Sequence, residues 1–83
     1  MIIDLTPITD SKTLKIRAGK DTAYFTIFFD SFYKLYVINI YDLDGAVRVG
    51  RVLSSGMNHY YNVNNRISLV RTGSSVEVKP NEA

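Results

Sequence analysis

Residues 34–41 read KLYVINIY and are followed directly by DLDG at residues 42–45. β-branched and aromatic side chains dominate this stretch, and they suit the pleated surface of a strand. Both faces of the strand are apolar apart from Asn39, which is typical of a central strand packed on both sides. Gly45 adopts positive φ without strain, so residues 42–45 predict a hairpin turn. Residues 46–53 are then the returning strand, with a bulge at Gly50.

Five more strand-like segments flank this hairpin, separated by turn residues. They span residues 2–5, 12–17, 22–29, 66–72 and 75–79. No segment has a convincing helical period, although residues 57–65 fit either a strand or a helical turn. The sequence therefore predicts an all-β fold, a single domain over residues 1–83 with a polar tail at residues 80–83. We expect a small antiparallel barrel or sandwich of six to seven strands.

The inward-facing positions of these strands predict the hydrophobic core. The side chains expected there are Leu14, Ile16, Phe25, Ile27, Phe29, Ile38, Ile40, Val49 and Leu69. A chain of 83 residues builds only a small core. Since 46% of the residues are apolar, we expect part of the apolar surface to face a partner.

Common stabilising devices of small domains are missing from the sequence. There is no Cys for a disulfide, and His59 is the only His, so we expect neither a structural metal nor a cofactor. The chain does not open with a cationic stretch ahead of an apolar one, so we expect no signal peptide. No apolar run approaches the roughly 20 residues that span a bilayer, so we expect no membrane partner. The simplest location is a cytoplasm.

Residues for nucleophilic catalysis are equally scarce. Ser54 and Ser55 lie near His59 but lack the Gly-x-Ser-x-Gly context of a nucleophile elbow. We interpret His59 as an exposed loop residue. Asp42 and Asp44 resemble the start of a calcium loop, but the residues that follow Gly45 break the ligand pattern. We therefore expect turn-forming carboxylates and no enzyme.

Charge is distributed unevenly along the chain. The net charge is only +2, yet residues 45–76 contain Arg and no acidic residue. The candidate basic patch consists of Arg48, Arg51, Arg66 and Arg71. With Tyr24, Tyr36, Tyr60 and Tyr61, these side chains suit a small β-barrel that binds single-stranded nucleic acid. The same composition suits a protein interface, and the low net charge favours protein partners over nucleic acid.

Aromatic residues gather at two expected turns. The interface candidates are Phe32, Tyr33, Tyr60 and Tyr61. The aromatic content of the chain exceeds what one small core readily hides, and sheet edges add unpaired backbone groups. We therefore expect a symmetric homo-oligomer or docking on a larger assembly.

One run of motifs resembles a known family. It comprises YFTIFFD at residues 24–30, YVINIYDLDG at residues 36–45, Val49-Gly50 and Ser55-Gly56. Over about residues 2–58 the chain is similar to the small baseplate plug proteins of contractile-tailed bacteriophages, the cyanophage-type plug. The resemblance implies a non-enzymatic virion component, made in the host cytoplasm and placed in the tail baseplate. Its partners would be hub or spike proteins of the tail.

Overall fold

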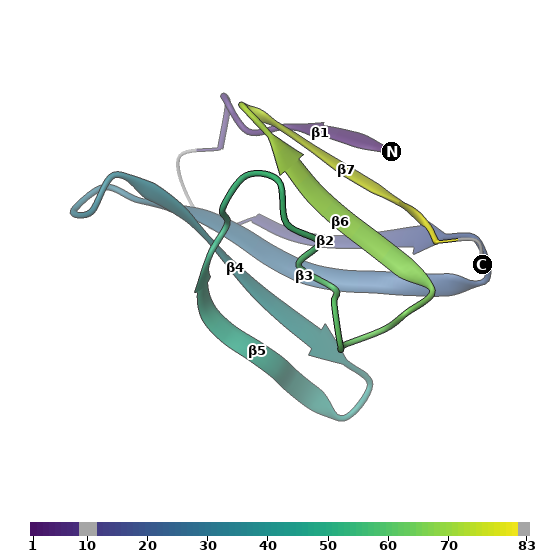
Figure 1. Ribbon diagram of the computed structural model, residues 1–83. Helices are drawn as coiled ribbons and strands as arrows, with labels where there is room; N and C mark the ends of the chain where they lie inside the picture. The colour runs from purple at the N-terminus through teal and green to yellow at the C-terminus, as the bar shows by residue number, and fades with distance from the viewer. Residues whose placement is uncertain (9–11, 82–83) are drawn as a thin grey trace.

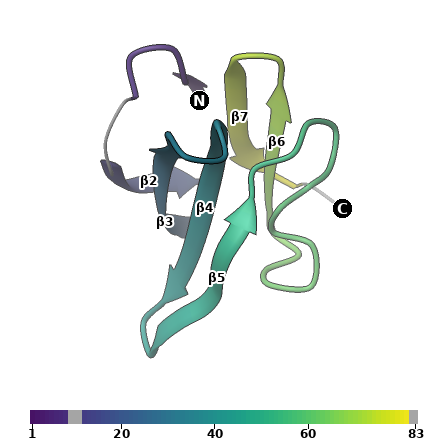
Figure 2. The ribbon, with the colours of Figure 1, turned by 90° about the vertical axis from the view of Figure 1, so that its left-hand side faces the viewer.

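The computed structural model describes residues 1–8 and 12–81, which form seven strands in two antiparallel sheets (Figure 1). The strands are β1 (Ile2–Asp4), β2 (Lys12–Ala18), β3 (Asp21–Asp30), β4 (Leu35–Asp42), β5 (Gly45–Val52), β6 (Ile67–Thr72) and β7 (Ser75–Pro80). One sheet has the order β2-β3-β4-β5 and the other the order β1-β7-β6. The all-β prediction is confirmed. The two sheets pack as a sandwich and do not close into a barrel (Figure 2).

The four-stranded sheet is a meander in which β4 pairs with both β3 and β5. The stretch KLYVINIY thus provides a central strand, as its two apolar faces predict. Residues 42–45 form the expected hairpin, where Asp42 Oδ1 accepts a hydrogen bond of 2.8 Å from the Asp44 amide and Gly45 has φ of 130°. A short side chain that accepts a nearby backbone N–H is what makes Asp a turn residue.

Strand β5 carries two irregularities opposite β4. Ile38 pairs with Arg51 and Ile40 with Arg48, so two steps along β4 match three along β5. Tyr41 then pairs with Ala46, so one step on β4 matches two on β5. Each mismatch is a β-bulge with one extra residue on β5. The first lies at Gly50, as predicted; its φ is 67° and its amide donates to Asn39 Oδ1 at 2.7 Å.

The core lies between the two sheets, where alternate side chains of each strand meet. The predicted core residues that are buried are Ile16, Phe25, Ile27, Ile38, Ile40 and Leu69. Leu14 and Phe29 are only partly buried. Val49 is wrong as a core residue: it is 66% exposed. The bulge at Gly50 breaks the inward–outward alternation there, and β5 is the outermost strand of its sheet.

The connection between β5 and β6 (residues 53–66) crosses from one sheet to the other (Figure 1). It resolves the ambiguity at residues 57–65, which form turns with an isolated bridge between Asn58 and Val70. Asn58 Oδ1 accepts hydrogen bonds from the Tyr60 and Leu69 amides, at 3.0 and 3.1 Å. Asn62 has φ of 61°, a conformation that Asn tolerates better than most residues. Side-chain hydrogen bonds thus replace regular secondary structure.

Candidate protein-interaction surface

The turn between β3 and β4 projects at one end of the molecule (Figure 1) and presents two aromatic rings. Phe32 is 83% exposed and Tyr33 is 69% exposed, and their rings pack edge to face with centroids 4.8 Å apart. Asp30 Oδ1 accepts hydrogen bonds from both of their amides, at 2.9 and 3.1 Å. Lys34 closes the turn with φ of 56°. The aromatic tip, residues 31–34, is therefore a defined turn that holds apolar rings in solvent.

The other expected aromatic pair is split by the fold. Tyr61 is exposed, but Tyr60 is only 2% exposed and belongs to the core. Burial raises the pKa of Tyr60 to about 12. The nearby Tyr24 backbone lowers the pKa of Tyr60 by less than burial raises it. The Tyr60 hydroxyl nevertheless has no hydrogen-bond partner of ordinary geometry. A buried ring offers nothing to a partner, so Tyr60 is withdrawn from the interface candidates.

Two of the four Arg candidates hold the chain together. Arg48 donates from Nη2 to the Tyr61 carbonyl at 2.6 Å and from Nη1 to the His59 carbonyl at 3.3 Å. Arg71 donates to the Leu53 and Gly73 carbonyls, at 2.8 and 2.7 Å. Arg71 thus holds the start of the β5–β6 connection at Leu53, and Arg48 holds its middle at residues 59 and 61. These hydrogen bonds could not be predicted from the sequence, because their acceptors are backbone carbonyls, which every residue has.

The four Arg residues do not form one patch. Arg71 lies over the ring of Tyr36, with Cζ 5.2 Å from the centroid, at the end of β6. Arg66 precedes the start of β6 and lies beside the β2–β3 turn with Lys20. Arg66 and Arg71 are five residue steps apart along the strand direction, which is about 17 Å between their Cα atoms. Only Arg48 and Arg51 share a site, in the cleft described below.

His59 is buried, with 3% exposure, and this contradicts its interpretation as an exposed loop residue. Its Nε2 lies 3.0 Å from the Ser54 carbonyl. A carbonyl only accepts, so Nε2 carries the proton. The Ser54 hydroxyl is directed instead to Met57 Sδ at 3.3 Å. His59 is therefore a structural residue that closes the 54–59 turn, and its bond to Ser54 does not pair a base with a nucleophile.

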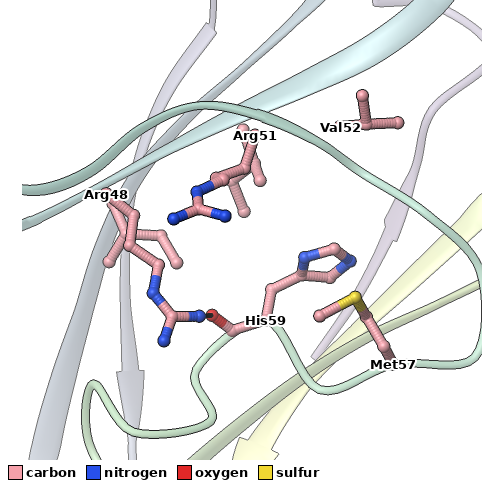
Figure 3. Close-up of a pocket in the computed structure, with 7 residues that line it drawn as sticks. Arg48, Arg51, Val52, Met57 and His59 are labelled. Atoms are coloured by element: carbon pink, nitrogen blue, oxygen red, sulfur yellow. Dashed lines mark hydrogen bonds between the residues drawn. The ribbon is translucent and has the colours of Figure 1, made fainter.

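A small cleft opens between β5 and the β5–β6 connection (Figure 3). Its volume is about 170 Å³. Its lining residues are Ile38, Ile40, Arg48, Arg51, Val52, Met57 and His59. The guanidinium groups of Arg48 and Arg51 and the ring of His59 surround the same space in Figure 3. This cleft could not be predicted from the sequence, because its lining residues come from β4, β5 and the β5–β6 connection, which the fold brings together.

The remaining surface supplies few other groups with chemistry. Among residues 1–8 and 12–81, no three His, Asp or Glu side chains lie together in a way that would hold a metal ion. Within the same part of the chain, no helix is long and apolar enough to cross a membrane. Comparison with known proteins gives no relative, since no family model, no curated protein and no solved structure matches the chain.

Proposed function

We propose that this protein is a non-enzymatic structural subunit that acts through protein–protein contacts, in the baseplate of a contractile phage tail. The observation that carries the interaction role is the aromatic tip, where Phe32 and Tyr33 stand in solvent on a projecting turn. The assignment to a phage tail comes from the sequence resemblance over about residues 2–58. The aromatic tip thus supports the role in protein–protein contacts, and the resemblance supports the location in a phage tail baseplate.

Physical reasons favour the aromatic tip as a contact point. Large aromatic side chains are frequent among the residues that dominate binding energy at interfaces. Asp30 already orders the turn through two hydrogen bonds, so little entropy is lost when the tip docks. Leaving two aromatic rings in water has a free-energy cost that a partner's pocket would remove. Exposed Val47, Val49 and Val52 on β5 offer further apolar area.

The nucleic-acid alternative has weaker support. Arg48 and Arg71 already donate to backbone carbonyls, and Arg66 lies at the far end of β6 from Arg71. A groove that tracks a nucleic-acid backbone needs several free cations in a row. A salt titration with an oligonucleotide tests it, because such binding weakens steeply with salt. Protein partners, hub or spike proteins or further copies of this chain, remain the proposal.

The test of the interaction surface compares three proteins by light scattering across a concentration series. They are the wild type, the double variant Phe32→Ser with Tyr33→Ser, and the control Leu43→Ser. Leu43 is a fully exposed apolar residue on the hairpin turn at the other end of β4, so its loss removes exposed apolar surface at a different site. We expect the tip variant alone to reduce self-association. A wild type that stays monomeric at high concentration removes self-assembly and leaves docking on a hub.

The setting has a separate test in the neighbouring genes. Tail-tube, hub or tape-measure genes beside the one that encodes this chain support the baseplate role. The pull-down of such a hub protein by the wild type, and its loss in the Phe32→Ser and Tyr33→Ser variant, is the expected result. A neighbourhood without any tail gene would refute the phage assignment.

A further inference from the structure

The cleft beside β5 contains a guanidinium group that the protein itself does not use. Among the described residues, Arg51 makes no side-chain hydrogen bond and no ion pair. Arg48, by contrast, is held in place by the His59 and Tyr61 carbonyls. Figure 3 shows both guanidinium groups at the cleft, with that of Arg48 at the His59 carbonyl and that of Arg51 apart from it. The site therefore combines a fixed cation with one that is free to bind.

The other residues that line the cleft are apolar, except for His59, which is held by a hydrogen bond. Ile38 and Ile40 pair with Arg51 and Arg48 across the strands, so these four side chains share one face of the sheet. The His59 ring is anchored through Nε2 to the Ser54 carbonyl, and it faces the guanidinium groups across the cleft (Figure 3). Apolar surroundings strengthen the attraction between a cation and an incoming anion relative to open water.

The segments that carry Arg48 and Arg51 and the facing connection contain no acidic residue. Residues 45–76 contain no Asp or Glu, and the one ion pair in the described chain joins Lys79 to Glu77 on β7. No Asp or Glu is among the residues that line the cleft, so the Arg51 guanidinium has no carboxylate partner there. A guanidinium group matches the planar, two-oxygen geometry of a carboxylate and binds it through paired hydrogen bonds.

The size of the cleft selects among anions. About 170 Å³ is well below the roughly 300–1,000 Å³ of clefts that hold drug-sized ligands and cofactors. One amino-acid side chain is the kind of group that fits such a volume. The apolar residues Ile38, Ile40 and Met57 suit the methylene groups of that side chain.

We propose that this cleft is a docking site for an acidic side chain, Glu or Asp, of a partner protein, with Arg51 as the residue that binds its carboxylate. The inference rests on the proposed function, since it names the chemistry of the partner's contact. Arg48 keeps the opposite wall in place, and Met57 and His59 bound the cavity. The site is separate from the aromatic tip, which gives the partner a second point of attachment.

The experiment is an NMR titration of the full chain with N-acetyl-glutamate methylamide. Its matched control is N-acetyl-glutamine methylamide, which has the same shape without the charge. We expect saturable shifts of the Met57 methyl, His59 ring and Arg51 side-chain signals with the glutamate probe, with a dissociation constant on the order of 1–10 mM for so small a fragment. Arg51→Gln should weaken this binding about tenfold, the loss of one charge-assisted contact, and Arg66→Gln, an exposed Arg that does not line the cleft, should leave it unchanged.

Several results would overturn the proposal. These are equal binding of the glutamine probe, equal binding by the Arg51→Gln variant, or no saturable shift at these signals. A short oligothymidylate that saturates the same signals more tightly than the glutamate probe would assign the site to phosphate. None of these outcomes touches the light-scattering test of the aromatic tip, so failure of the cleft and failure of the interaction role are distinguishable.

Discussion

Replacement of Arg71 by Met tests whether this residue joins the two sheets. The guanidinium donates to the Leu53 carbonyl at 2.8 Å and lies 5.2 Å from the centroid of Tyr36, whose hydroxyl donates to the Leu5 carbonyl. A partly buried hydrogen bond from a charged donor contributes about 1.5–3 kcal/mol. The cation–π contact adds about 0.5–1 kcal/mol, whereas the exposed bond to Gly73 adds little because water replaces it. The expected loss of unfolding free energy is therefore about 2–4 kcal/mol.

Urea denaturation measures this loss. It is followed by circular dichroism, because the chain has no Trp whose fluorescence could report unfolding. Arg66→Met is the control, because the Arg66 side chain makes no hydrogen bond among the described residues and should change stability by less than about 0.5 kcal/mol. Arg71→Lys keeps the charge but not the fork of donors, so it should fall between the two. Equal stabilities of the Arg71→Met and Arg66→Met variants would refute the structural role and return Arg71 to the candidate binding residues.

Three further substitutions follow from the fold. Ile38→Ala should cost about 2–5 kcal/mol in urea denaturation, because the side chain is fully buried between the sheets; a loss below about 1 kcal/mol would mean that β4 is not central. Gly19→Ala should cost more than Gly73→Ala, since both residues have φ near 60° but only the Cβ at residue 19 would meet Pro80, at 3.1 Å; equal losses would show that this contact relaxes freely. Tyr60→Phe should be neutral or stabilising by up to about 1 kcal/mol, because it removes a buried hydroxyl without a partner. The same variant should abolish a loss of wild-type stability between about pH 10 and 12, because the unfolded chain gives up the Tyr60 proton before the folded one does; an unchanged pH profile would contradict the raised pKa.

The strands were predictable because their signals are local. Alternation, β-branched residues and turn residues such as Asp42 and Gly45 act over a few positions, and all seven strands lie where these patterns place them. Val49 was misplaced because a bulge adds one residue and breaks the two-residue period on which the core prediction depends. The pattern predicts a bulge at Gly50, but not which side chains it turns outward.

The candidate site was less predictable because its contacts are distant in sequence. Phe32 and Tyr33 were identified correctly as turn residues, since Asp30 organises that turn locally. The burial of Tyr60 and His59 depends instead on how residues 53–66 lie across the sandwich. Arg48 fixes that path by bonding to backbone carbonyls, and every residue type supplies a carbonyl. From composition alone, an Arg with a structural role therefore cannot be distinguished from one that binds a ligand.

The two bulges of β5 also affect how copies of this protein can meet. A strand that carries one residue too many at two places cannot present an even row of donors and acceptors to a flat incoming strand. The pairing of strand on strand, the route by which open sheets grow into fibrils, is thereby disfavoured along β5, one of the two edges of the four-stranded sheet. Any association along β5 would therefore have to use side chains, whose shapes limit it to particular geometries.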